Sequence, residues 1–107
     1  PMIDARRMEV YTAFYDASNQ VIKALTPFIV NEENLKSYLE NYTLVLGGSG
    51  AEKCFEIYKS YNNIILDFEL KSSAKYLIPL AIEKYRLKDF ADLAYFEPNY
   101  LKEFVGK

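Results

Sequence analysis

The chain has 107 residues, a length that suits one domain with a hydrophobic core. Half of the residues are hydrophobic and the net charge is −2, so the composition excludes a disordered chain and a strongly basic nucleic-acid-binding protein. The sequence has no histidine and one cysteine, which excludes Ser-His-Asp and Cys-His catalysis and a zinc site. We therefore expect no enzyme activity, no metal and no cofactor.

Two further absences bear on location. No stretch approaches the roughly 20 apolar residues that cross a bilayer, so we expect no transmembrane segment in this chain. A single cysteine forms no internal disulfide and fits a reducing compartment. We expect a cytoplasmic protein, either complete in this chain or one domain of a longer protein.

The first expected element is a helix over residues 4–26. Its apolar side chains recur at steps of three and four, which is typical of an amphipathic helix. Its expected N-cap is Asp4, and Pro27 should end it because proline disfavours helical geometry in the residue before it. The apolar positions are Met8, Tyr11, Phe14, Tyr15, Ser18, Val21, Ile22 and Leu25.

A second helix is predicted from Asn31, as its N-cap, to about Leu46. Glu32 and Glu33 would place negative charge at its positive end. The β-branched character of residues 42–46 also fits a strand. We favour a helix there, because no other segment offers an alternating partner strand.

Glycines punctuate the chain at residues 47–50. The first of them would end the second helix, and Ser49 with Glu52 has the Ser-x-x-Glu spacing of a capping box for a third helix over 50–70. A backbone anion site at this loop is the less favoured alternative, because the lysine and the preceding strand of a phosphate-binding loop are missing. Cys54 lies on a heptad-like seam and is expected in the core rather than as a nucleophile. The seam comprises Cys54, Tyr58, Tyr61, Ile65 and Phe68.

A fourth helix is predicted from Ser72 or Ser73 to about Tyr95. Pro79 either kinks this helix or begins it after a separate turn over 73–78, and we favour a kinked or two-part helix. A short terminal helix would follow Pro98 and contain Tyr100, Leu101, Phe104 and Val105. The predicted fold class is thus all-α: an antiparallel bundle of four main helices plus a short C-terminal helix, in a single domain over residues 2–107.

These positions carry a resemblance to a loose class of uncharacterised bacterial or phage small α-helical domains. The pattern covers about residues 6–90 and ends in a partial match at Lys88-Asp89-Phe90. The resemblance implies a helical fold and a bacterial or phage origin, and it implies no activity. Its other positions are Arg7, Tyr11, Phe14 and Ala17, then Leu44, Leu46, Gly48 and Ser49, then Leu80 and Ile82.

The aromatic content favours a protein–protein interaction or self-association module, since the chain has 10 Tyr and 7 Phe and tyrosine is enriched at interfaces. Candidate contact residues for a protein partner or a second copy are Tyr58, Tyr61, Tyr85, Tyr95 and Tyr100. The alternative is a small nucleic-acid-associated or phage-type regulatory protein, although nucleic acid is not the expected partner. It would use the basic residues Arg6, Arg7, Lys84, Arg86 and Lys88 for weak anion contacts.

Overall fold

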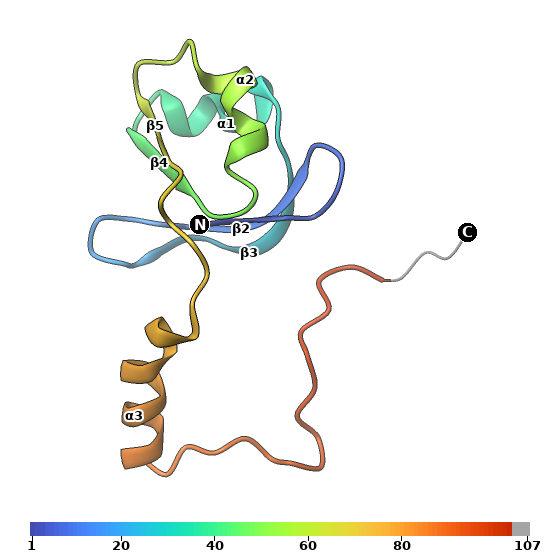
Figure 1. Ribbon diagram of the computed structural model, residues 1–107, viewed down its shortest axis with the longest axis vertical. Coiled ribbons are helices and arrows are strands. Elements are labelled where there is room, and N and C mark those ends of the chain that lie inside the picture. The colour runs from blue at the N-terminus through green and yellow to red at the C-terminus, as the bar shows by residue number, and fades with distance from the viewer. Residues whose placement is uncertain (104–107) are drawn as a thin grey trace. The chain divides into compact units, whose positions relative to one another are not determined.

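The computed structural model describes residues 1–103, and these form a mixed α/β structure, which corrects the predicted all-α bundle. The described residues contain five strands in two sheets (Figure 1). The chain divides into two compact units, which we call the N-terminal unit (residues 1–71) and the C-terminal segment (described for residues 72–103). Each is described by itself.

A three-stranded antiparallel sheet opens the N-terminal unit. Strands β1 (Met2–Asp4), β2 (Glu9–Tyr15) and β3 (Val21–Ile29) follow one another in the sheet as they do in the sequence. In β2 the side chains of Val10 and Thr12 are buried, at 0% and 4% exposure, because alternate residues of a strand point to the same face.

The predicted helix over 4–26 is therefore wrong. Tyr11, Phe14 and Tyr15 match a helical period, but they are also aromatic residues of the kind enriched in strands. The chain reverses at Asp16, whose carboxylate accepts hydrogen bonds from the backbone N–H groups of Ser18 (2.8 Å) and Gln20 (2.9 Å). Such local side-chain bonding favours a turn over a continuing helix.

Helix α1 (Glu32–Leu39) begins where the sequence predicts, and Asn31 is confirmed as its N-cap. The Asn31 side chain accepts a hydrogen bond of 2.8 Å from the backbone N–H of Asn34. The helix ends at Leu39 rather than Leu46. The residues that follow include β4 (Leu44–Gly47), so the strand alternative for this stretch is the correct one.

Strand β4 pairs in parallel with β5 (Ile64–Asp67), with Leu44 opposite Ile64. A parallel pair needs a crossover, and residues 48–63 supply it through a 3₁₀ turn, η1 (Glu52–Cys54), and the short helix α2 (Phe55–Tyr58). The long third helix over 50–70 is therefore wrong. Its apolar positions are divided between this crossover and β5.

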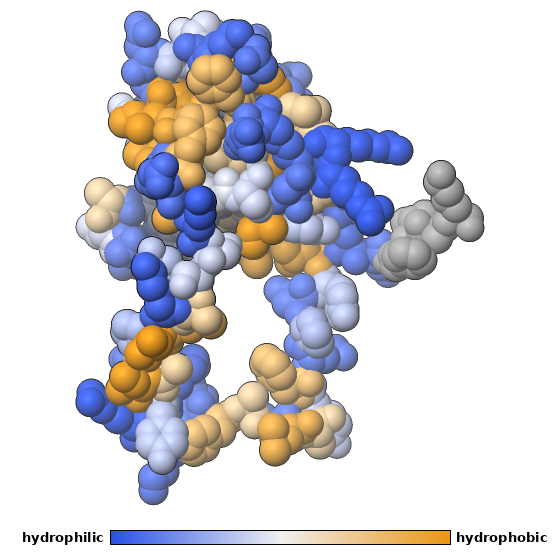
Figure 2. All heavy atoms as spheres, in the orientation of Figure 1, coloured by the Kyte–Doolittle hydropathy of each residue, from blue (hydrophilic) through white to orange (hydrophobic). Residues whose placement is uncertain are grey.

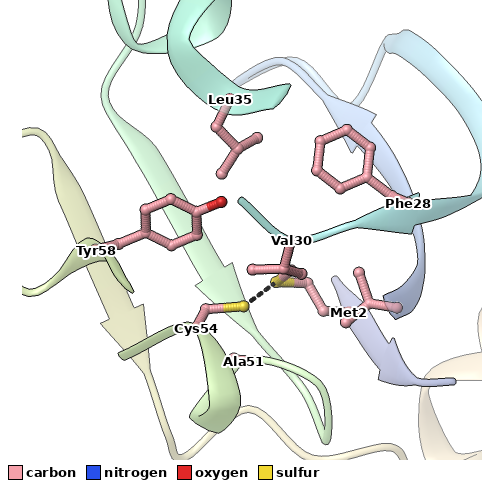
Figure 3. Packing of buried hydrophobic residues seen from close by; sticks show 8 residues of the cluster. Met2, Phe28, Val30, Leu35, Ala51, Cys54 and Tyr58 are labelled. Carbon is pink, nitrogen blue, oxygen red and sulfur yellow. Dashed lines mark hydrogen bonds between the residues drawn. The ribbon is translucent and has the colours of Figure 1, made fainter. Parts of the chain in front are cut away.

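The hydrophobic core lies between the three-stranded sheet, α1 and the crossover (Figure 3). The sulfur atoms of Cys54 and Met2 lie 3.9 Å apart within it. The Tyr58 hydroxyl donates to the backbone oxygen of Asn31 at 2.7 Å, so the buried ring keeps a partner for its polar end. The buried cluster comprises Met2, Val10, Phe28, Val30, Leu35, Ala51, Cys54 and Tyr58.

The C-terminal segment contains the 3₁₀ turn η2 (Ala74–Leu77) followed by helix α3 (Ile78–Arg86). Pro79 stands in the first turn of α3, where its missing N–H costs no helical hydrogen bond. The two-part form of the fourth helix is thus confirmed, although α3 ends at Arg86 and not near Tyr95. Residues 98–103 include no helix, and Phe104 and Val105 of the predicted terminal helix lie outside the described residues.

Candidate functional site

The C-terminal segment carries many large apolar side chains and buries none of them. Throughout residues 72–103 no residue is buried. Figure 2 shows hydrophobic residues on the surface around η2 and α3. Leu93 is 99% exposed, so this segment by itself has no hydrophobic core. Its exposed apolar residues are Tyr76, Leu77, Ile78, Leu80, Ile82, Tyr85, Leu87, Phe90, Leu93, Tyr95, Phe96 and Tyr100.

Helix α3 carries three of these residues at the spacing found in helices that bind other proteins. Ile78, Ile82 and Tyr85 occupy positions i, i+4 and i+7 and therefore lie on one face. Helices that bind in a groove of another protein present anchors at this spacing. The face is ordered before any partner arrives, which lowers the entropy cost of binding.

The end of α3 is fixed by a compact cap. Lys88 has a left-handed backbone (φ 55°), and the Asp89 N–H donates to the Lys84 oxygen at 2.9 Å. The ring of Phe90 meets that of Tyr85 edge-on, with centroids 5.8 Å apart. The cap thereby holds two exposed aromatic rings together at one end of the helix.

The five predicted contact tyrosines fall into two groups. Tyr58 is 1% exposed and belongs to the core, with the half-buried Tyr61 against it at a centroid distance of 6.1 Å. A buried ring such as that of Tyr58 presents no surface to a partner. Tyr85, Tyr95 and Tyr100 are 72%, 84% and 81% exposed, and their predicted role in contacts stays a prediction.

The predicted basic residues also separate. Lys84, Arg86 and Lys88 lie in the C-terminal segment. The Lys84 ammonium group pairs with the Asp89 carboxylate at 2.5 Å, and this hydrogen bond raises the pKa of Lys84. Part of the basic character of this cluster is therefore neutralised locally.

Arg6 and Arg7 lie instead in the turn between β1 and β2. Both have left-handed backbone angles, with φ of 77° and 49°. This geometry costs roughly 1–2 kcal/mol at a residue other than glycine. The turn is closed by a 3.1 Å hydrogen bond from the Glu9 N–H to the Arg6 oxygen.

The ammonium group of Lys53 forms hydrogen bonds to this turn, a role that the sequence did not predict. Its ammonium group donates to the Arg7 oxygen at 2.9 Å, to the Glu9 oxygen and to the Asp4 carboxylate. The Asp4 carboxylate also accepts from the Arg6 N–H at 3.0 Å. The hydrogen bond from Lys53 is the main reason why the pKa of Asp4 lies below its ordinary value.

The glycine loop does a structural task. The Gly50 N–H donates to the Met2 oxygen at 2.9 Å, and a Cβ on Gly48 would lie 2.4 Å from that same oxygen. Ser49 accepts a hydrogen bond from the Asp4 N–H at 3.2 Å and so ties the loop to β1; η1 begins after Ala51 without a side-chain cap. The capping box is therefore wrong, and the loop serves to pack closely on β1.

Cys54 is fully buried beside this loop, as the sequence predicts. Desolvation raises the pKa of its thiol to about 11. The thiol keeps its proton near neutral pH and is shielded from reagents.

An apolar cavity of about 580 Å³ opens in the N-terminal unit between the three-stranded sheet, α1 and β4. The ring of Phe14 lies against those of Phe28 and Tyr38, with centroid distances of 5.7 and 4.5 Å. Cavities of this size and lining hold apolar groups.

Comparisons with known proteins add no family. No protein-family model matches the chain, and no curated protein matches it. The described residues contain no group of three or more acidic, cysteine or histidine side chains placed to hold a metal ion. None of the helices in residues 1–103 has the length and apolar character needed to cross a membrane.

Proposed function

We propose that the chain is a protein–protein interaction module whose contact surface is the apolar face of the C-terminal segment. The observation that carries the proposal is the complete absence of buried side chains in residues 72–103, despite twelve large apolar residues that are exposed there. Burying such residues against another surface is favourable by about 25 cal/mol per Å² of apolar area.

The tyrosine-rich character of this surface supports a protein as the ligand. Tyr85, Tyr95 and Tyr100 combine an apolar ring with a hydroxyl group that remains satisfied at a wet interface. Aromatic residues are the usual centres of binding energy in protein interfaces. A nucleic-acid partner has less support, since the net charge is negative and Lys84 is engaged by Asp89.

Self-association is the form of this function that purified protein tests directly. Light scattering during size-exclusion chromatography should give a mass above 12.4 kDa that falls on dilution. The double variant Ile78→Gln, Ile82→Gln should elute as a monomer, because it removes apolar anchors from exposed positions without disturbing a core.

The matched control is Val21→Gln, a similar change at a side chain that is 61% exposed in the N-terminal unit. It should leave the measured mass unchanged. If the parent chain is a monomer at every concentration, a second copy is not the partner. If the mass depends on concentration but is insensitive to the Ile78 and Ile82 changes, the contact surface lies elsewhere.

A further inference from the structure

We propose that the cavity between the three-stranded sheet, α1 and β4 binds an uncharged, mainly apolar small molecule that contains an aromatic ring. All the residues that line this cavity lie in the range 1–46, within the N-terminal unit. The proposed contact surface for a protein lies in residues 72–103 instead. The inference therefore does not rest on the proposed interaction function.

The size of the cavity suits a small molecule. Its volume of about 580 Å³ lies within the range of roughly 300–1,000 Å³ that is typical of ligand pockets. An apolar cavity of about 150 Å³ is enough to bind benzene, so this one has room for a molecule of roughly two or three rings. A protein partner, by contrast, typically covers about 800 Å² of surface on each side of an interface.

Apolar side chains line the cavity in its buried part and also where it meets water. Met2, Phe28 and Leu35 belong to the lining and are buried. Ile22 and Tyr42 line it too, but they are 43% and 50% exposed. A bound apolar molecule would cover these exposed side chains and displace water that finds few polar partners on this wall. Both changes favour binding.

Three aromatic rings on the wall favour a ligand that contains a ring. Phe14, Phe28 and Tyr38 come from β2, β3 and α1, and all three line the cavity. The ring of Phe14 contacts both of the others, and its plane is tilted by 55° in each pair. Aromatic rings in tilted or edge-on contact gain more than burial of their area alone provides. An aromatic ligand would extend a group of rings that already packs in this way.

The charged groups of the lining favour an uncharged ligand. Within residues 1–103, Asp16 is the one carboxylate on the lining, which has no lysine or arginine. Its carboxylate already accepts from the N–H groups of Ser18 and Gln20, and its exposure to water weakens its attraction for a cation. The amino group of Pro1 also lies on the lining, and desolvation lowers its pKa below the ordinary value of 8.0, which disfavours its charged form.

The buried polar atoms of the wall are also engaged. The hydroxyl group of Thr12 donates to the Pro1 oxygen at 2.7 Å. In the part of the chain that the structure describes, no buried side-chain nitrogen or oxygen lacks a hydrogen-bond partner. A strongly polar ligand would lose hydrogen bonds to water without gaining such a partner, so the ligand is mainly apolar.

The test begins with N-phenyl-1-naphthylamine, an uncharged probe whose fluorescence rises in apolar surroundings. Titration of the full chain into this probe should give a saturable rise with a Kd on the order of 0.1 mM or tighter. Amide NMR of the ¹⁵N-labelled chain with 1-naphthol, which is uncharged near neutral pH, then locates the site. The shifts should fall on residues 12–17 and 43–46, which line the cavity.

Competition against the fluorescent probe tests the preference for an uncharged ligand. The competitors share one ring system: 1-naphthol, the anion naphthalene-1-sulfonate and the cation trimethyl(1-naphthylmethyl)ammonium. The neutral compound should displace the probe at a concentration at least tenfold lower than either charged compound requires.

The decisive variant is Ile22→Gln, Tyr42→Gln, which makes two exposed positions of the lining polar. Probe affinity should fall at least fivefold, while the urea midpoint stays close to that of the parent. The matched control is Leu25→Gln, Phe68→Gln, which alters one aliphatic and one aromatic side chain that are each 50% exposed and do not line the cavity. It should change the affinity less than twofold.

Four results would overturn the proposal: no saturable binding of the probe, NMR shifts outside the lining, equal displacement by a charged competitor, or equal effects of the two double variants. The Ile78→Gln, Ile82→Gln variant should bind the probe as the parent does. Loss of binding in that variant would place the probe on the C-terminal segment and would also overturn the proposal. Because the NMR readout comes from residues 12–17 and 43–46, its failure leaves the proposed interaction function untouched.

Discussion

The ammonium group of Lys53, in η1, forms an ion pair with the carboxylate of Asp4 at the end of β1, 49 positions earlier in the chain. The same ammonium group bonds the backbone oxygens of Arg7 and Glu9. One largely buried cation, with 19% of its side chain exposed, therefore joins the crossover to the first β-turn. Its contacts add to the backbone hydrogen bonds that already close that turn.

A substitution of Lys53 tests whether these contacts stabilise the fold. Lys53→Met keeps the apolar stem and removes the charge. It leaves the Arg7 oxygen without this donor and the Glu9 oxygen with the Ala5 N–H alone, so we expect a loss of about 2 kcal/mol in the free energy of unfolding. Urea unfolding followed by circular dichroism measures it. Lys59→Met, at an exposed ion pair with Glu56, should cost at most about 0.5 kcal/mol. Equal effects of the two substitutions would contradict this stabilising role of Lys53.

The ion pair between Asp4 and Lys53 also predicts that the folded protein loses stability at acid pH. The pKa of Asp4 in the folded protein is lower than its ordinary value of 3.8, so its contribution is present above that pH and is lost as the pH falls through the lowered value. Urea midpoints measured from pH 5 down to pH 2 should decline, and Asp4→Asn should decline less steeply over this range. Parallel curves for parent and variant would show that Asp4 has no part in the limb.

Close packing of the glycine loop on β1 predicts an intolerant position. Gly48 has a φ of +100°, and a Cβ there would lie 2.4 Å from the Met2 oxygen, which is backbone and has no rotamer to change. Gly48→Ala should therefore destabilise the chain by at least about 2 kcal/mol. The neighbouring Ser49→Ala removes one exposed hydrogen bond and should cost no more than about 1 kcal/mol. A Gly48→Ala variant as stable as the parent would contradict this close approach of the loop to β1.

Burial of Cys54 predicts a thiol that does not react in the folded protein. With a pKa of about 11 and no exposed surface, it should react with a bulky maleimide at pH 8 at a rate set by unfolding. The rate should rise steeply across the urea transition, as measured by intact mass. Prompt labelling of the native chain would place the thiol outside the core.

Local chemistry was the predictable part of this fold. Asn31 followed by two glutamates predicts a helix start, and the structure has one there. Proline near position 79 predicts a helix in two parts, which η2 and α3 confirm. These signals act within one turn of chain, so the sequence alone displays them.

Long-range pairing was the part that escaped prediction. Residues 9–15 hold apolar side chains at both helical and alternating steps, and only the partners β1 and β3 select the strand. Residues 44–47 pair in parallel with a strand twenty positions away, so the sequence contains no hairpin turn that would indicate the pairing. The ion pair between Lys53 and Asp4 is likewise a long-range contact, and no sequence motif links the two residues.

The measurement that tests the central claim most directly is site-specific photo-crosslinking in cells that express the full chain. A photoreactive residue in place of Tyr85, 72% exposed on α3, should give a discrete protein adduct, and the Ile78→Gln, Ile82→Gln changes should abolish it. The same residue in place of Val21, 61% exposed in the N-terminal unit, should give none. Absence of any adduct at Tyr85, or equal adducts at both positions, would contradict a C-terminal segment built for contact with another protein.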